Sequence, residues 1–257
     1  MEGGRCLACC LRSPLKKGEE PCEDALMLFD AGPLGVFVAL ADGAGGHQSG
    51  RAASGLVLDT VGEALIARAA QAESGFTAPA FEALETANQR VRELGVGAAT
   101  TFAAASIRDL QVRTLHVGDS EVVLMGQRGA IRLQTVSHSP VGYAREAGLL
   151  DEEEALLHED RHIVSNMVGA DDMRVEIAGA TPIAPRDTLL LASDGLFDNL
   201  YLGEIVEICR KGPLERAADQ LEQRARDRMS GAEPGMPGKA DDLSFILYRR
   251  TVPPRGS

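Results

Sequence analysis

The sequence predicts an α+β fold in which antiparallel sheets are covered by helices. Six short segments rich in Val, Ile, Leu, Thr and Phe alternate along the chain with long segments whose apolar residues have helical spacing. Tight turns join several of the strand-like segments, which favours antiparallel pairing. With 257 residues, of which 44% are hydrophobic and 25% charged, the chain has an ordinary globular composition, and we expect one domain.

The six predicted strands are bounded by Gly, Asp or Ser, which is the usual pattern for short strands. They span residues 35–42, 100–107, 112–125, 130–136, 187–195 and 243–250. Inside the third segment, the triplet Gly118-Asp119-Ser120 is typical of a tight turn between paired strands. We therefore expect a hairpin at residues 112–125.

Three long helices are predicted, and we expect them to cover the sheets. They fit residues 49–72, 79–94 and 203–229. In the second, Leu84, Ala87 and Val91 recur at spacings of three and four, as on one face of an amphipathic helix. Residues 230–240 have the composition of a flexible loop. Residues 138–172 form an acidic, partly helical insertion without a strand pattern.

The charge balance limits the classes of partner that the chain can bind. A formal net charge of −12 argues against nucleic acid and anionic membranes and leaves room for bound cations. We find neither a transmembrane segment nor a secretory signal, so we expect a cytoplasmic protein, and we expect a monomer.

The clustered residues Cys6, Cys9 and Cys10 lack the second ligand pair of a metal site, and we interpret them as reduced thiols.

Acidic residues lie at the ends of several predicted strands. Glu23 and Asp24 open the apolar segment "CEDALMLF", Asp42 ends the strand before a glycine cluster, Asp194 ends a late strand, and Asp241 opens the last one. Two like charges about 4 Å apart cost several kcal/mol at intermediate dielectric, and a bound cation removes that cost. Oxygen ligands favour Mg²⁺ or Mn²⁺ over Zn²⁺. For any one of these residues, an isolated surface acid or a turn cap is the alternative.

Six motifs follow one another along the chain: "EDA" (23–25), "ADGAGGHQSGRAAS" (41–54), "GAATTFAAASI" (97–107), "LHVGDSEVVLM" (115–125), "LLLASDGLFDNL" (189–200) and "ADDLSFIL" (240–247). Their order, from about residue 20 to residue 248, resembles that of the bacterial form of the metal-dependent type 2C (PPM) serine/threonine protein phosphatases. The resemblance implies a four-layer αββα sandwich of two antiparallel sheets flanked by helix pairs. It also implies a single phosphatase domain, residues 1–257, with metal ions in a cleft at one end of the sandwich.

The resemblance assigns roles to individual residues. It implies that Asp42 bridges two Mn²⁺ or Mg²⁺ ions, with Glu23 and the Gly43 carbonyl at one ion and Asp194 and Asp241 at the other. The catalytic residues are then Asp24, Asp42 and Asp194, with Asp24 orienting the reacting water. Bacterial relatives also hold a third ion, and the matching residues are Asp119 and Asp198 together with Asp194. For these two, a hairpin-turn role for Asp119 and a cap of the helix after Leu202 for Asp198 are the alternatives.

The implied function is hydrolysis of phosphoserine and phosphothreonine on proteins by a water activated between two metal ions. The expected partners are a phosphorylated protein substrate and the bacterial serine/threonine kinase that the enzyme opposes. The sequence departs from the family where Glu19 replaces a phosphate-binding arginine, because a carboxylate cannot pair with phosphate. Lys16 or Lys17 could substitute. The alternatives are a pseudophosphatase or phosphoprotein-binding module and a hydrolase of small phosphoesters.

Two further features concern substrate and proton transfer. Ala44 stands where eukaryotic members of the family carry a histidine, and His47 is either the proton donor or a packing residue. The insertion 138–172 matches a flap beside the cleft. We expect its leucines, Leu149, Leu150, Leu156 and Leu157, to pack an acidic, solvated helix onto the protein, with Arg145, Arg161 and His162 as the alternative source of substrate contacts.

Overall fold

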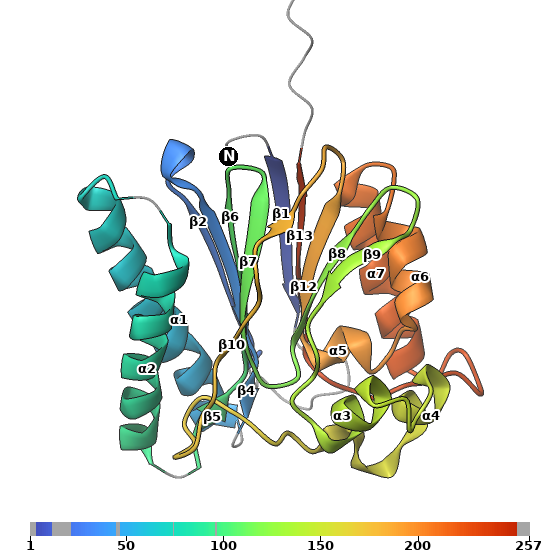
Figure 1. Cartoon of the computed structure of the whole chain (residues 1–257). Coiled ribbons are helices and arrows are strands. Elements are labelled where there is room, and N and C mark those ends of the chain that lie inside the picture. The colour runs from blue at the N-terminus through green and yellow to red at the C-terminus, as the bar shows by residue number, and fades with distance from the viewer. Residues whose placement is uncertain (1–3, 12–21, 45–46, 74, 96, 251–257) are drawn as a thin grey trace, which may run out of the picture.

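The computed structural model describes residues 4–11, 22–44, 47–73, 75–95 and 97–250, and these form four layers in which two sheets lie between two helical layers (Figure 1). In spatial order, the first sheet contains β10 (Glu176–Ile177), β7 (Gln111–Val117), β6 (Phe102–Arg108), β3 (Val36–Ala41) and β2 (Ala25–Asp30), and β11 (Thr181–Pro182) also pairs with β7. The second contains β1 (Gly4–Leu11), β13 (Leu243–Arg250), β12 (Thr188–Ala192), β8 (Glu121–Met125) and β9 (Ile131–Gln134).

All pairs of neighbouring strands in both sheets are antiparallel. The helices α1 (His47–Ala70) and α2 (Thr77–Leu94) cover the outer face of the first sheet, and α6 (Leu202–Cys209) and α7 (Leu214–Met229) cover that of the second (Figure 1). The predicted α+β class, with two antiparallel sheets flanked by helix pairs, is therefore confirmed.

The central strands are apolar on both faces because each face meets another layer. Along β3, Phe37 and Ala39 pack with the helices α1 and α2, while Val36 and Val38 pack between the two sheets. Successive side chains of a strand point to opposite faces, so burial on both sides removes the polar alternation that half-exposed strands show. The same division holds on β12, where Leu189 and Leu191 face the first sheet and Leu190 faces α6 and α7.

The prediction of one long helix at 203–229 is wrong, because the chain forms two helices there, α6 and α7. The break lies at Gly212, whose φ of +85° is outside the helical region, and at Pro213, which immediately precedes α7. Proline lacks the N–H that a helix interior needs and disfavours helical geometry in the residue before it. Apolar spacing continues on both sides of the break, which is why the pattern predicted one helix.

The predicted hairpin at Gly118-Asp119-Ser120 is also wrong. The strand before it, β7, belongs to the first sheet and the strand after it, β8, to the second, so these three residues cross from sheet to sheet. Gly118 has a φ of +103°, and a Cβ there would lie 2.7 Å from the Cβ of Thr101. The crossover therefore places Asp119 at the end of the sandwich, between the two sheets.

The sequence did not predict β1, which pairs with β13 along its whole length and carries the cysteine cluster. Burial raises the pKa of Cys6 to about 11 and that of Cys209 to about 12, which disfavours the reactive thiolate form. These two thiols are therefore suited to packing. Within the described residues, no helix is both long enough and apolar enough to cross a bilayer.

Candidate metal centre

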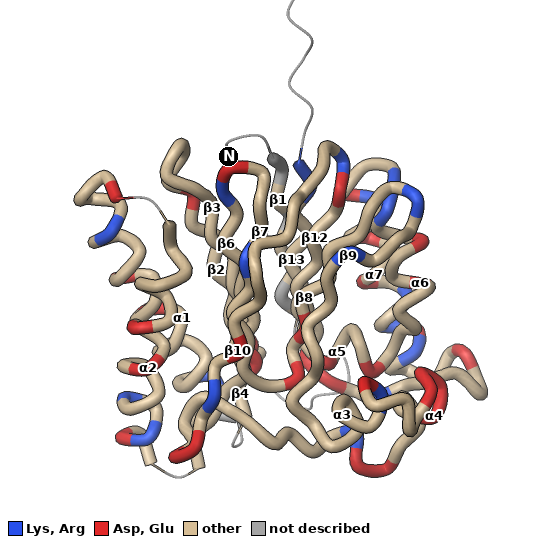
Figure 2. The backbone as a smooth tube through the Cα atoms, viewed as in Figure 1, with Lys and Arg blue, Asp and Glu red and all other residues tan. Residues whose placement is uncertain are grey.

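Acidic residues from five separate segments meet at one end of the sandwich, near the lower ends of the sheets in Figure 2. Desolvation raises the pKa of Asp42 well above its usual value, and the nearby charges of Asp24, Asp194, Asp119 and Asp241 raise it further. The structure therefore brings these five predicted residues into electrostatic contact. Because carboxylates in this arrangement repel one another, the site has a strong affinity for positive charge.

The backbone at Asp42 is fixed by two neighbouring threonines. Its N–H donates to Thr101 Oγ1 at 3.0 Å, and its carbonyl accepts from Thr101 N–H and from Thr100 Oγ1, both at 2.8 Å. Asp42 is thereby held at the junction between β3 and β4 (Gly43–Ala44), which pairs with β5 (Ala99–Thr100). Neither threonine was predicted from the sequence as a support of the site.

Two glycines let the segment after Asp42 pack against the start of α1. A Cβ on Gly43 would lie 2.3 Å from the carbonyl carbon of Gly50, and a Cβ on Gly50 would lie 2.7 Å from Glu23 Oε1. Only glycine permits so close an approach of two backbones. The same contact places the Glu23 carboxylate beside Gly50 and the Glu23 backbone carbonyl beside Gly43.

Asp24 has a second carboxylate beside it that the sequence analysis missed. Ligand atoms of Cys22, Asp24 and Asp242 lie within 4.8 Å of one another. Asp242 Oδ2 accepts from the Glu23 N–H at 2.9 Å, and Ser193 Oγ donates to Asp24 Oδ2 at 3.3 Å. Asp242 thus joins the start of β2 to the start of β13. Its position directly after Asp241 in the sequence could have identified it as a residue of the site.

Asp194 is the first residue of α5 (Asp194–Phe197), a short helix directly after β12. A Cβ on the next residue, Gly195, would lie 1.8 Å from the carbonyl oxygen of Asp242. Gly195 is therefore needed for α5 to lie against the segment that enters β13. This contact brings Asp194 close enough to Asp241 for their charges to interact, although 46 residues separate them in the chain.

Lys239 lies among the carboxylates, which the sequence analysis did not predict. Its Nζ forms ion pairs with Asp194 Oδ2, with Asp198 Oδ2 at 3.0 Å and with Asp241 Oδ2 at 3.2 Å. Burial alone would lower the pKa of Lys239, but the three aspartate charges outweigh that effect and raise it. Burial and the charge of Asp194 raise the pKa of Asp241 to about 6, against the lowering effect of Lys239.

The two residues predicted to hold a third ion lie beside the same group. Burial, then the charges of Asp194 and Asp198, raise the pKa of Asp119. Burial and the charge of Asp194 raise the pKa of Asp198 to about 7, although Lys239 and Arg161 lower it. Both structural alternatives are wrong, because Asp119 lies in a crossover and the residue that precedes α6 is not Asp198 but Tyr201.

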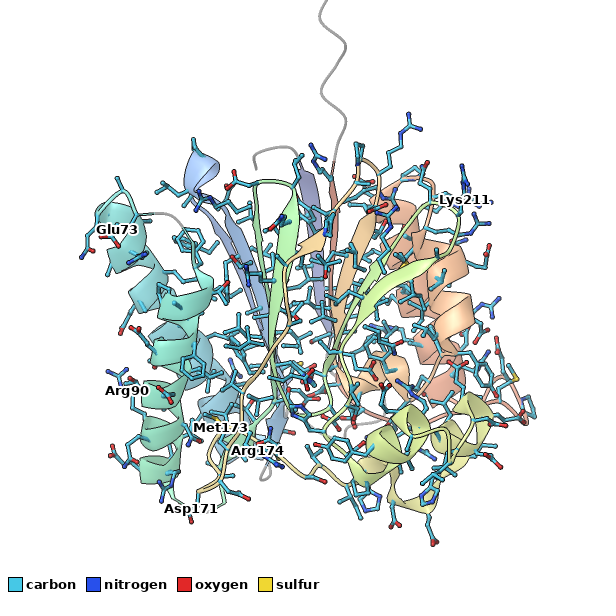
Figure 3. The ribbon with its side chains drawn as sticks, in the orientation of Figure 1. Glu73, Arg90, Asp171, Met173, Arg174 and Lys211 are labelled. Atoms are coloured by element: carbon cyan, nitrogen blue, oxygen red, sulfur yellow. The ribbon has the colours of Figure 1, made fainter. Side chains whose placement is uncertain are left out.

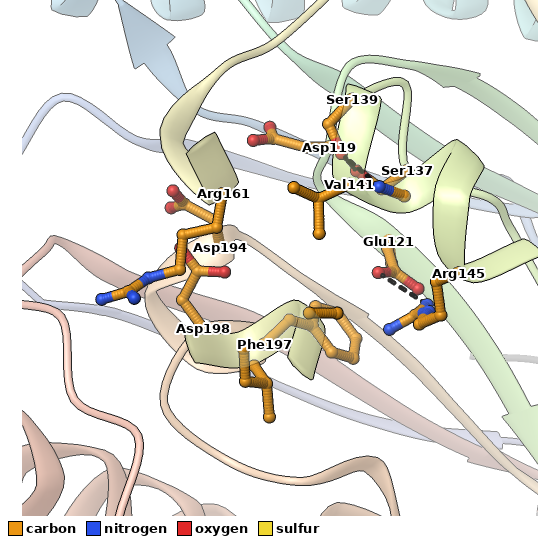
Figure 4. Close-up of a pocket in the computed structure, with 13 residues that line it drawn as sticks. Asp119, Glu121, Ser137, Ser139, Val141, Arg145, Arg161, Asp194, Phe197 and Asp198 are labelled. Atoms are coloured by element: carbon orange, nitrogen blue, oxygen red, sulfur yellow. Dashed lines mark hydrogen bonds and ion pairs between the residues drawn. The ribbon is translucent and has the colours of Figure 1, made fainter. Parts of the chain in front are cut away.

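The insertion 138–172 lies beside these acids and contains α3 (Pro140–Glu146), α4 (Glu152–Leu157) and the 3-10 helix η2 (Glu159–His162). Figure 4 shows the small pocket, of about 50 Å³, between this flap and the acids. Arg161 lines the pocket together with Asp194 and Asp198. Arg145 also lines the pocket, but it is already paired with the buried Glu121, their closest atoms being 3.5 Å apart.

The predicted packing of the flap by its leucines is partly wrong. Leu149 is 77% exposed and Leu157 is 56% exposed, whereas Leu156 is buried together with Val141 and Ala155. His162 Nδ1 lies 2.9 Å from the carbonyl oxygen of Glu159, within its own 3-10 helix. Among the three flap residues proposed to contact substrate, Arg161 is therefore the one whose position suits that role.

A second group of possible ligands, which comprises His116, His138 and Glu176, is better explained as a support for the crossover. The Gly118 backbone N–H donates to the ring atom Nδ1 of His138 at 3.1 Å, and the backbone N–H of His138 donates to the Gly118 carbonyl at 2.8 Å. Since Nδ1 accepts, the ring proton is on Nε2, which lies 3.3 Å from Glu176 Oε2. A metal at Nε2 would displace that proton, so His138 suits a structural role that holds the segment before Asp119.

The carboxylates suit a hard divalent cation. Asp194 Oδ1 is buried and accepts no hydrogen bond from any described residue, an arrangement that is costly unless a cation satisfies the oxygen. The ammonium group of Lys239 shows that positive charge fits between Asp194, Asp198 and Asp241. Oxygen-only donors of this kind fit Mn²⁺ or Mg²⁺.

Several residues considered in the sequence lie outside the described part of the chain. Glu19, Lys16 and Lys17 fall in the range 12–21, and the side chain of His47 is likewise not described. Their predicted roles stay predictions. Ala44 is described and pairs with Ala99 in the small sheet of β4 and β5.

A family model described as protein phosphatase 2C matches residues 13–230. The chain belongs to the protein phosphatase 2C family. A putative protein phosphatase 2C-type of Streptococcus pyogenes is 31% identical over 191 residues, which cover 72% of this chain and 77% of the relative. The predicted family is therefore confirmed, and its relatives have the predicted enzyme class.

Solved structures agree with this assignment. Serine/threonine phosphatase Stp1 from Staphylococcus aureus has a TM-score of 0.74 and 27% identity, covering 97% of this chain and 95% of that one. The catalytic domain of the serine/threonine protein phosphatase PstP was solved in complex with two manganese ions. It has a TM-score of 0.72 and 21% identity over 97% of this chain and 99% of that one, so it supports the fold alone.

The close contact at Gly195 gives a testable prediction. Gly195→Ala is expected to lower the free energy of unfolding by about 2 kcal/mol or more, because the added methyl group overlaps the Asp242 carbonyl. In Gly203→Ala, the matched control on α6, the added Cβ has no neighbour within 4 Å, and the stability should be unchanged or slightly higher. Urea unfolding measures both, and equal stabilities for the two variants would contradict the packing described here.

Proposed function

We propose that this chain is a metal-dependent phosphatase that hydrolyses phosphoserine and phosphothreonine on proteins. The observation that carries the proposal is the convergence of carboxylates from separate strand ends around Asp42, in a chain of the protein phosphatase 2C family. A single domain of residues 1–257, with its core at about residues 20–248 and residues 138–172 as a flap, is part of the same proposal. A pure binding module has no evident use for repelling carboxylates buried in this way.

Two Mn²⁺ or Mg²⁺ ions are proposed at the carboxylates. Asp42 would contact both, Glu23 and the Gly43 carbonyl would complete the shell of one, and Asp194 and Asp241 would hold the other. A third ion would be held by Asp119 and Asp198 together with Asp194. When bound, such ions supply positive charge that clamps phosphoryl oxygens and lowers the pKa of water.

The remaining work falls to residues of the chain. Asp24 is buried and accepts a hydrogen bond from Ser193, which fixes the carboxylate in an orientation suited to directing a water molecule at phosphorus. Arg161, at the edge of the pocket, is suited to pairing with a phosphoryl oxygen. This contact would compensate for Glu19, which cannot make the pairing of the family's arginine.

The proposed partners are a phosphorylated protein and the serine/threonine kinase that produces it, with the phosphatase acting as a cytoplasmic monomer. The net charge of −12 disfavours nucleic acid and anionic membrane surfaces as partners. Exposed Leu149 and Leu157 on the flap give a protein substrate an apolar surface to contact, which a small phosphoester would not use.

The function is tested by phosphate release from a phosphothreonine peptide, compared with a simple aryl phosphate. We expect turnover with Mn²⁺ or Mg²⁺, none after treatment with EDTA, and losses of at least about a hundredfold in Asp42→Asn and Asp194→Asn. Asp109→Asn, an exposed acid at the β6–β7 turn, should retain wild-type turnover. Full activity after exhaustive chelation would exclude the proposal, and turnover of the aryl phosphate alone would indicate a small-phosphoester hydrolase.

The position of Arg161 predicts its effect on substrate capture. Arg161→Ala should lower kcat/KM for the phosphopeptide by roughly tenfold, because one charged contact with the phosphoryl group is lost. His162→Ala is the neighbouring control, since its ring lies against the backbone of η2, and it should stay within about twofold of wild type. If both variants behave alike, Arg161 does not contact the substrate.

A further inference from the structure

Lys239 reaches the carboxylates of Asp194, Asp198 and Asp241 from a backbone that is held firmly. Asn199, which is fully buried, donates from Nδ2 to the Lys239 carbonyl at 2.9 Å and accepts the Lys239 N–H at Oδ1 at 2.8 Å. The same Nδ2 donates to the Gly195 carbonyl at 2.9 Å, which ties this loop to α5. The segment that presents Lys239 is thus attached to the helix that presents Asp194.

A second contact holds the loop from the other side. A Cβ on Gly238 would lie 2.6 Å from the carbonyl oxygen of Arg228, so the residue before Lys239 packs directly on the end of α7. The Arg228 side chain, itself buried, donates to the Asn199 carbonyl at 3.3 Å. Because the backbone is held at both residues, the Lys239 ammonium can leave these carboxylates only by rotation of its flexible side chain.

The Lys239 ammonium lies where a divalent cation would bind. It contacts Asp194, Asp198 and Asp241 at once, and two of these are the side chains proposed for one metal ion. An ammonium group and a divalent cation cannot share these oxygens, because each of them, when bound, fills the space between the carboxylates and neutralises their negative charge. Binding of one therefore weakens binding of the other by mass action.

We propose that Lys239 is a tethered counter-ion that neutralises Asp194, Asp198 and Asp241 before metal binds and that a divalent ion must displace. The inference rests on the proposed function. It has two consequences: the metal-free protein is protected from carboxylate repulsion, and the affinity for metal at this position is lowered. If the Lys239 ammonium is bound to these carboxylates for about nine-tenths of the time, the apparent metal affinity is reduced about tenfold.

The test compares Mn²⁺ binding to the full chain by isothermal titration calorimetry in the wild type and in Lys239→Met. The variant keeps most of the side-chain length but lacks the charge, and we expect one Mn²⁺ site to bind roughly tenfold more tightly. Lys239→Arg, which retains the charge, should bind no more tightly than wild type. Lys211→Met is the matched control, because Lys211 is exposed and follows α6 at the opposite end from the flap (Figure 3).

Thermal unfolding gives a second measurement that does not depend on activity. Without metal, Lys239→Met should unfold roughly 5 °C below the wild type, since three carboxylates then lack their counter-ion. Saturating Mn²⁺ should remove that difference. A lysine with only a structural role would leave the variant less stable under both conditions and would not raise its metal affinity.

The outcomes separate this inference from the proposed function. If the wild type and Lys239→Met bind Mn²⁺ equally well, or the variant binds more weakly, the counter-ion role is overturned while the metal centre stands. If neither protein binds Mn²⁺ or Mg²⁺, the proposed metal centre itself fails. Tighter binding in Lys239→Met together with wild-type affinity in Lys211→Met supports the inference.

Discussion

Electrostatic repulsion among carboxylates at one end of the sandwich is the constraint on which the site depends. Asp42 is surrounded by Asp24, Asp119, Asp194 and Asp241, and both desolvation and their charges raise its pKa. Such an arrangement persists only where the fold fixes the backbone and positive charge compensates the acids. In the metal-free protein the compensating charge comes from Lys239, and in the proposed enzyme it comes from divalent ions.

The energy that holds these acids together comes from apolar packing elsewhere in the fold. Three buried clusters, one between the sheets and one under each helix pair, lock the strands whose ends carry the carboxylates. Close backbone contacts then bring the ends together, at Gly43 against Gly50 and at Gly195 against Asp242. The glycine that follows each of Asp42 and Asp194 thus serves a packing purpose, and it sets the position of the acid beside it.

Much of the fold and the acidic cluster could be predicted from the sequence, because strands buried on both faces have a strong local signature and their terminal acids are conspicuous. The hairpin at 118–120 could not be corrected from the sequence, since a tight turn looks the same whether its strands pair or separate into two sheets. Lys239 was missed because a loop of Gly, Pro and small residues says nothing about where one long side chain reaches. Exposure of Leu149 and Leu157 was missed because an amphipathic pattern does not show which leucines a short helix buries.

A crystal structure of the full chain soaked in Mn²⁺, with anomalous diffraction recorded at the manganese edge, would locate the ions directly. The proposed metal centre and counter-ion predict one peak beside Asp42 and the Gly43 carbonyl, a second at Asp194 and Asp241, and a Lys239 Nζ that has left Asp194. Absence of peaks at these carboxylates, or a second peak with Lys239 still bound to Asp194, would contradict them.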